Sequence, residues 1–355
     1  MAVEADNNSD DEELPEGEVV RRVAFDIGSN ATKCQVADVD LASGRILNIV
    51  MAQEVPCSFG VDWKQSKDGR LSDRMQDRGL QTLHMLCKTA VDKGATRAAA
   101  IATEVFRKAS NGEDYLKRVK SEIGLTAKIV TQELEGRLGF LSAVALSSVP
   151  RASLICWDCG GASFQVCREP EAAGSASDSL DSELLCFLAP VGVSVATAAC
   201  VEAIQKKDFA TTPSPNPVSA EQAYALVAHI QSRLPLPPDW LVGAAEVVAI
   251  GGSNSMFCLA TEILAELGCQ SVTTFSARDA RRALDAVVGR TEEELFAAYC
   301  DRDLADPPSF VVPKMALLSA VMDACKLPQV TFQPAIGSCA GMLVSDDLYG
   351  EAMLA

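Results

Sequence analysis

The sequence predicts an alternating α/β fold with an internal duplication. Two glycine-containing turns carry this prediction, and each follows an aspartate at the end of a short apolar run. The first covers residues 26–30 (Asp-Ile-Gly-Ser-Asn) and the second residues 158–163 (Asp-Cys-Gly-Gly-Ala-Ser). Such turns bring backbone N–H groups close to phosphate oxygens. A matched pair therefore suggests a duplicated fold that holds phosphate groups between its halves.

Strand and helix patterns alternate around the first turn. Short β-type runs flank it, and an apolar stripe at helical spacing follows, with Ser72 as the expected N-cap. We expect strands over residues 23–25, 32–36, 45–51, 98–103 and 127–130, and helices over residues 72–92, 114–123 and 132–144.

The second half repeats the order of strand, turn and strand. A third strand then leads into residues 251–255 (Gly-Gly-Ser-Asn-Ser), where a helix N-terminus could hold an anion, although a tight turn is an equally good interpretation. Residues 170–182 and 211–217 are expected loops. We expect strands over residues 152–157, 163–167 and 247–250, and a helix over residues 219–234 capped by Ser219.

Length and charge indicate two domains behind an acidic tail. The chain has 355 residues and a net charge of −17, and residues 1–18 carry eight acids and no base. We expect a disordered tail over residues 1–19, an N-terminal domain over residues 20–135 and a C-terminal domain over residues 136–355. Neither a run of ~20 apolar residues nor a signal-type N-terminus is present, which predicts a cytoplasmic protein without a membrane partner. The negative charge disfavours nucleic-acid binding.

The cysteines and histidines exclude some classes of site. Of the thirteen cysteines, only Cys156 and Cys159 have a two-residue gap, and no second such pair completes a zinc site. We therefore expect reduced thiols in a reducing compartment. With only two histidines, His-centred catalysis is not expected.

In order along the chain, several blocks resemble the exopolyphosphatase / guanosine pentaphosphate phosphatase (Ppx/GppA) family of the actin–hexokinase–Hsp70 superfold. The resemblance runs from about residue 20 to 345. Its blocks are the two turns at residues 26–30 and 158–163, together with residues 103–112, 133–138 and 250–253. It implies two ribonuclease-H-like (actin-like ATPase) domains with a cleft between them, and the last helix is allowed to cross back to the first domain.

The resemblance also implies roles for individual residues. Glu135 falls on the family's catalytic base, which orients the attacking water. Asp26 and Asp158 are the expected ligands of Mg²⁺, the expected cofactor. The expected phosphate-binding residues are Gly28, Ser29, Asn30, Arg107, Gly160, Gly161, Ala162, Ser163, Gly252 and Ser253.

Several positions depart from the family pattern. Ala162 replaces a third glycine, Phe164 a threonine and Gln165 a glutamate, while residues 337–341, including Ala340, lack the usual Arg and Glu. The chain resembles the short, two-domain members. These changes allow weaker metal binding, altered substrate choice or loss of activity.

We expect a Mg²⁺-dependent hydrolase that releases terminal phosphate from polyphosphate or guanosine pentaphosphate. A homodimer is allowed. Two alternatives stay open. One is a catalytically weak regulatory protein that binds polyphosphate or a nucleotide. The other is an ATPase or phosphotransferase of the same superfold, with an adenosine pocket near residues 251–255.

Overall fold

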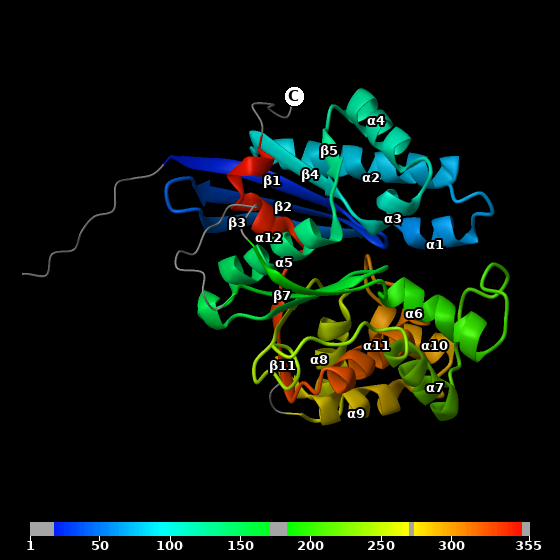
Figure 1. Ribbon diagram of the computed structural model, residues 1–355. Helices are drawn as coiled ribbons and strands as arrows, with labels where there is room; N and C mark the ends of the chain where they lie inside the picture. Colours follow the sequence, from blue (N-terminus) through cyan, green and yellow to red (C-terminus); the bar gives the residue numbers. More distant parts are fainter. Residues whose placement is uncertain (1–17, 171–182, 270–272, 350–355) are drawn as a thin grey trace, which may run out of the picture.

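A computed structural model describes residues 18–170, 183–269 and 273–349. They form two halves, each built on one sheet with helices packed against it (Figure 1). The predicted acidic tail lies outside the described residues except for Glu18 and Val19, and Val19 begins the first strand. Most of the predicted loop over residues 170–182 also lies outside them.

The first sheet has the strand order β3-β2-β1-β4-β5. Three neighbouring strands, β1 to β3, are antiparallel, and β4 and β5 continue the sheet parallel to β1. Its strands are β1 (Val19–Ile27), β2 (Ala31–Asp40), β3 (Arg45–Pro56), β4 (Arg97–Ala102) and β5 (Ala127–Ile129), and the helices of this half are α1 (Phe59–Gln65), α2 (Asp73–Asp92), α3 (Glu104–Lys108) and α4 (Gly112–Ile123). All five predicted strands are present, and Ser72 caps α2 by accepting a hydrogen bond from Met75 N at 3.2 Å.

The second sheet repeats this plan. Its order is β10-β11-β9-β6-β7-β8, in which β6, β7 and β8 are antiparallel neighbours and β9 and β11 run parallel to β6. The strands are β6 (Cys156–Cys159), β7 (Phe164–Arg168), β8 (Leu185–Ala189), β9 (Val248–Gly251), β10 (Thr274–Ser276) and β11 (Gln329–Pro334). Only the edge strand β10 has no counterpart in the first sheet, so the predicted duplication is confirmed.

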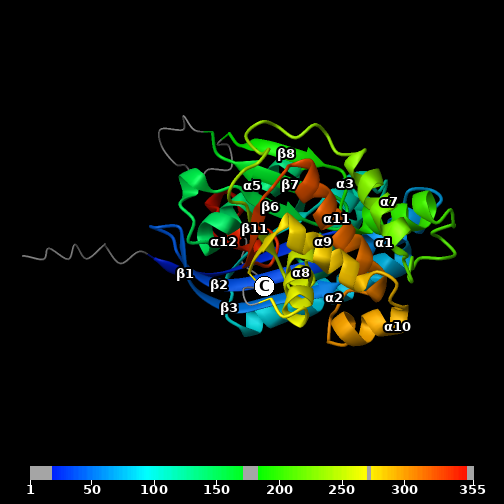
Figure 2. The ribbon, with the colours of Figure 1, turned by 90° about the horizontal axis from the view of Figure 1, so that it is seen from below.

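The helices of the second half lie mainly on the side of the second sheet that faces away from the first half (Figures 1 and 2). They are α6 (Val193–Ala199), the π-helix Cys200–Ile204, α7 (Ala220–Gln231), α8 (Met256–Glu266), α9 (Ala277–Val287), α10 (Glu292–Leu295) and α11 (Val311–Ala324). The predicted cap Ser219 begins α7, but this helix ends at Gln231 rather than at residue 234. The strand predicted over residues 152–157 begins only at Cys156 in the structure, because residues 151–153 form a 3₁₀ turn. No helix in the described ranges is long and apolar enough to cross a bilayer.

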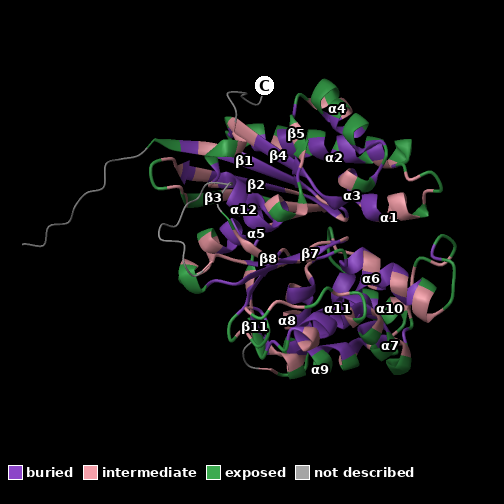
Figure 3. Ribbon diagram, in the orientation of Figure 1, coloured by how far each residue is buried: buried purple, intermediate pink, exposed green. Residues whose placement is uncertain are grey.

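Two helices lie between the sheets, α5 (Gln132–Leu146) and α12 (Cys339–Leu343). α12 packs on β1, β2 and α5, while α5 packs on β6 and β7. Both helices have buried faces (Figure 3). The chain therefore returns to the first half at its C-terminal end, a crossing that the resemblance had allowed. The predicted domain boundary between residues 135 and 136 falls inside the continuous helix α5, and the boundaries stay a prediction.

Arg22 binds the C-terminal segment that returns to the first half. Its side chain is buried in β1 and donates hydrogen bonds to Leu343 O at 3.0 Å and to Asp346 Oδ1 at 2.5 Å. The guanidinium also lies 4.3 Å from the ring centre of Tyr349. A strand near the N-terminus and the end of the described chain are thus joined by one cation.

Candidate active site

The two glycine turns have the same local geometry. In the first, Gly28 N donates to Ala31 O at 2.9 Å, and in the second Gly160 N donates to Ser163 O at 2.9 Å. Each turn joins two antiparallel strands, and its aspartate sits near the end of the first strand. The hairpin register places Asp26 opposite Lys33. In the second hairpin, Asp158 lies opposite Gln165.

Both turns line one cavity of about 60 Å³ between the halves. The volume has room for a few water molecules. Among the residues predicted for the site, eleven line this cavity: Asp26, Gly28, Ser29, Asn30, Glu135, Asp158, Gly160, Gly161, Ala162, Ser163 and Gly252. The structure therefore brings together residues that are separated by up to 226 positions.

Direct contacts between the halves keep the cavity small. Ser194 Oγ of α6 donates to Asn30 Oδ1 at 2.5 Å. A Cβ at Gly161 would lie 2.5 Å from Asn30 Cγ, so only glycine lets the turns approach this closely. This hydrogen bond and this close approach therefore hold the two halves together beside the cavity.

Glu135 reaches the cavity from the first turn of α5. Thr131 caps this helix and accepts a hydrogen bond from Leu134 N at 3.2 Å. Glu135 is only 8% exposed. Burial raises its pKa to about 8, although the charge of Arg107 acts in the opposite direction. Four residues further on, on the same face of α5, Gly139 leaves space for Asp158, whose Cβ is 3.4 Å from where a Cβ of Gly139 would be.

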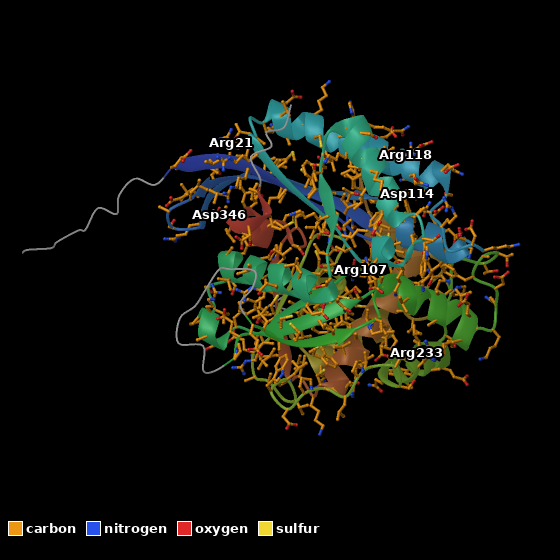
Figure 4. All side chains as sticks on the ribbon, turned by 45° about the horizontal axis from the view of Figure 1, so that its top comes forward. Arg21, Arg107, Asp114, Arg118, Arg233 and Asp346 are labelled. Atoms are coloured by element: carbon orange, nitrogen blue, oxygen red, sulfur yellow. The ribbon has the colours of Figure 1, made fainter. Side chains whose placement is uncertain are left out.

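Arg107 lies beside Glu135 rather than on the cavity wall. Its Nη1 and Nη2 atoms both donate to Glu135 Oε2, each at 3.1 Å, and Nη1 also donates to Val130 O at 2.5 Å. Figure 4 shows Arg107 between the two halves. The phosphate contact expected of Arg107 stays a prediction. What the structure shows is an ion pair that orients Glu135.

Asp26 and Asp158 are the two predicted metal ligands. Asp26 Oδ2 accepts a hydrogen bond from Ser338 N at 3.2 Å and lies 3.8 Å from Lys33 Nζ. Burial raises the pKa of Asp158 to about 6, with Lys33 lowering it and Asp26 adding to the rise. No group of three or more His, Cys, Asp or Glu side chains arranged for a metal occurs among the described residues. Mg²⁺ commonly uses one or two carboxylates plus substrate phosphates and water, so this donor pair fits Mg²⁺.

Comparison with known proteins agrees with this geometry. Residues 36–181 match the Ppx/GppA phosphatase family. Exopolyphosphatase 1 of Mycobacterium tuberculosis is 27% identical over 158 residues, which are 43% of this chain and 45% of the relative. The corresponding protein of Mycobacterium leprae is 32% identical over 109 residues, or 30% and 32% of the two chains. The family match covers less than half of this chain, which is therefore similar to the Ppx/GppA phosphatases over that segment. The matched segments span less than half of the length of these curated relatives.

Solved structures extend the likeness to the whole fold. The Aquifex aeolicus Ppx/GppA enzyme gives a TM-score of 0.66 at 20% identity and covers 92% of this chain and 99% of its own. An exopolyphosphatase from Cytophaga hutchinsonii gives 0.70 at 16% identity, with 92% and 99% covered. The two-domain, actin-like fold expected from the sequence is therefore confirmed.

The departures from the Ppx/GppA pattern fall mostly outside the cavity. Phe164 is fully buried in the core of the second half, where its ring packs 6.1 Å from that of Trp157. Gln165 is buried beneath α5, and its Nε2 donates to Ser163 Oγ at 3.2 Å. Ala340 is buried in α12. Of the predicted phosphate-binding residues, Ser253 does not line the cavity, and its carbonyl oxygen accepts a hydrogen bond from Arg302 at 2.7 Å.

Sequence reasoning missed several residues that line the cavity of this protein. Lys33 could have been found, because an antiparallel hairpin around residues 28–31 must place it opposite Asp26. Burial disfavours the charged form of Lys33. The negative charges of Asp26, Glu54 and Asp158 favour that form more strongly, so the pKa of Lys33 is raised. No sequence motif around Glu54 or Asp306 marks them as cavity residues, because the fold brings them to the cavity from separate segments of the chain. The missed acidic and basic residues of the wall are Lys33, Glu54, Glu104 and Asp306.

Proposed function

We propose that this protein is a phosphohydrolase that releases the terminal phosphate of polyphosphate. One observation carries the proposal. The buried carboxylate of Glu135 lines the same small cavity as the two glycine turns, whose N–H groups suit phosphoryl oxygens. The curated relatives are named exopolyphosphatases, which supports this substrate class.

Glu135 is placed to act as the general base. A group that accepts a proton near neutral pH works best when its pKa is near the working pH, and burial raises the pKa of Glu135 to about 8. Both hydrogen bonds from Arg107 go to Oε2. Oε1 is then the oxygen that would orient water and receive its proton. Attack on phosphorus breaks the bond to the bridging oxygen, and inorganic phosphate leaves with the oxygen of water.

The charge of the cavity supports a requirement for Mg²⁺. Its wall includes six acidic residues and one basic residue, Lys33. A polyphosphate would be repelled by such a wall unless cations accompany it. Asp26 and Asp158 would hold Mg²⁺ together with phosphate oxygens. When bound, the ion neutralises charge on the phosphoryl oxygens.

The size of the cavity favours recognition of a chain end. A volume of about 60 Å³ suits a single terminal group and not a chain that passes through. Guanosine pentaphosphate also ends in phosphate groups and is the second proposed substrate. A cytoplasmic location, a homodimer, and the absence of nucleic-acid and membrane partners stay predictions.

Phosphate release tests the proposal. The rate is measured on short and long polyphosphate and on guanosine pentaphosphate, with Mg²⁺ or with a chelator, for wild type and Glu135→Gln. We expect wild-type turnover that needs Mg²⁺ and a loss of ~100-fold or more in the variant. Glu122→Gln, an exposed acid on α4 that pairs with Arg118, is the matched control and should keep the wild-type rate. Equal rates for Glu135→Gln and wild type would exclude Glu135 as the base.

One observation favours a second candidate, a regulatory protein that binds the same ligands without turnover. A neutral amide, Gln165, stands opposite Asp158 where the resemblance implies a carboxylate, so Asp158 has one negative charge fewer beside it to help hold a metal. Polyphosphate binding by calorimetry, together with no phosphate release in Mg²⁺ or Mn²⁺, would identify this function. ATP protection against thermal unfolding would instead support the nucleotide-hydrolase alternative.

A further inference from the structure

Three cysteines form a row beneath α5. The strand register places Cys156 of β6 opposite Cys167 of β7, and Cys167 opposite Cys186 of β8. Side chains of directly opposed residues lie on the same face of a sheet. All thirteen cysteines of the chain are free thiols in this structure. The row therefore offers two neighbouring cross-strand pairs.

Cys167 and Cys186 meet the geometric requirement for a disulfide. Directly opposed antiparallel residues have Cα atoms about 4.5–5.5 Å apart, inside the range that disulfides span. Their sulfur atoms are already 3.0 Å apart. Cys167 is 1% exposed, whereas Cys186 is half-buried and within reach of a small oxidant. Because Cys186 is the more exposed of the two, its sulfur meets the oxidant first, and the hydrogen bond from Cys167 also lowers its pKa.

The other pair is less suited to oxidation. Cys156 is 2% exposed, and its thiol donates to Gly139 O at 3.4 Å. Cys156 and Cys159, the one pair with a two-residue gap, are three positions apart on the same strand and so face opposite sides of the sheet. The exposure of Cys186 and the short distance between the two sulfur atoms therefore make Cys167 and Cys186 the pair best suited to form a disulfide.

This cysteine pair lies directly under the first turn of α5. A Cβ on Gly136 would be 2.8 Å from Cys167 Sγ and 3.3 Å from Gln165 Cβ, so the helix backbone rests on β7 at these two residues. Gly136 immediately follows Glu135. A bond about 2.05 Å long requires the two sulfurs to approach by about 1 Å, which must alter the packing under this turn.

We propose that Cys167 and Cys186 form a reversible disulfide between β7 and β8 that shifts the first turn of α5 and with it Glu135. The oxidant is a hydroperoxide. The Cys186 thiolate attacks the peroxide, the O–O bond breaks, and Cys186 becomes a sulfenic acid while the other oxygen leaves as an alcohol or water. The Cys167 sulfur then displaces water from the Cys186 sulfur. Two thiols are oxidised, and one peroxide is reduced.

The bond itself is tested without any activity assay. The full chain is treated with hydrogen peroxide, remaining thiols are alkylated, and peptides are identified by mass spectrometry. We expect a Cys167–Cys186 linked peptide that disappears with dithiothreitol. It should be absent in Cys186→Ser and present in Cys269→Ser, a matched control at another half-buried thiol, which does not line the cavity. A linked Cys156–Cys167 peptide instead, or oxidation of other thiols without this link, would overturn the assignment.

The coupling to α5 needs a second readout. Hydrogen exchange of residues 132–138 is compared before and after oxidation, and we expect a change in wild type and Cys269→Ser but none in Cys186→Ser. The expected effect on phosphate release, which rests on the proposed function, is a loss of ~10-fold or more that dithiothreitol reverses. If the bond forms while exchange in this turn is unchanged, the coupling is wrong. If the protein releases no phosphate in either its reduced or its oxidised form, that result counts against the proposed function and leaves the disulfide to be judged by the peptide and exchange data.

Discussion

Arg107 and Glu135 are 28 residues apart in sequence, yet both terminal nitrogens of Arg107 donate to a single oxygen of Glu135 at 3.1 Å. Arg107 comes from the short helix α3 after β4, and Glu135 from the first turn of α5. Burial raises the pKa of Glu135 and Arg107 lowers it. This pair therefore sets the pH range over which the proposed base is available.

Replacing Arg107 with methionine should narrow that range. Without the cation, the pKa of Glu135 rises further, and the acid limb of the kcat/KM profile moves to higher pH by about one unit. At pH 7 the rate should fall ~10-fold or more. Arg118→Met, which removes a cation from surface pairs with Asp77 and Glu122, is the control and should leave the profile in place. An unshifted acid limb in Arg107→Met would show that this ion pair does not tune the base.

Glu135 should also make stability depend on pH. Its pKa is raised in the folded state, so its contribution to stability is complete below the unfolded value of about 4.3 and is lost as the pH rises through about 8. Glu135→Gln does not ionise. The free energy of unfolding of wild type should therefore fall relative to that of Glu135→Gln as the pH rises. Between pH 5 and pH 8 the difference between the two proteins should change by about 2–4 kcal/mol in favour of the variant.

Urea unfolding in the presence of a chelator and without phosphate measures this difference, because bound cations would favour the charged carboxylate. Glu122→Gln, at an exposed site, should show no such trend. A constant difference between Glu135→Gln and wild type across this range would mean that Glu135 ionises as it does in the unfolded chain.

The hydrogen bond between Ser194 and Asn30 should stabilise the closed cleft. It joins α6 of one half to the first turn of the other at 2.5 Å. A hydrogen bond of this kind contributes about 0.5–1.5 kcal/mol, so Ser194→Ala should raise KM for polyphosphate by about 3–10-fold. In a double-mutant cycle with Asn30→Ala, the two changes should be non-additive by about 1 kcal/mol. Thr197→Val removes a hydroxyl that bonds only within α6 and should leave KM unchanged.

The contact between α12 and α5 should tolerate no side chain at residue 341. A Cβ there would overlap Leu138 O and lie 2.9 Å from Ser142 N, and both are backbone atoms that cannot turn aside. Gly341→Ala should therefore lower the free energy of unfolding by about 1–3 kcal/mol. Ser121→Ala, on the exposed face of α4, should stay within about 0.5 kcal/mol in the same urea titrations. Wild-type stability in Gly341→Ala would mean that α12 does not sit this close to α5.

Local patterns predicted much of the fold. The hairpins around the two turns and the caps Ser72 and Ser219 were expected and are present. These features depend on residues within a few positions of one another. Several elements were not predicted, because their form depends on distant partners: β8, β10, β11, α1, α3, α6 and α9 to α11. The strand β11, for example, lies between β9 and β10.

The sequence by itself determined which side chains are available for chemistry. Two aspartate-led glycine turns, an acid at the start of a helix and the order of the family blocks were enough to name the candidate site. Only the tertiary structure decided their relations: Arg107 pairs with Glu135, the halves meet at Asn30, and Cys167 meets Cys186. Helical and hairpin patterns arise from neighbours along the chain. These contacts instead arise from strand order and from the burial of α5 between two sheets, and neither is encoded in any short segment.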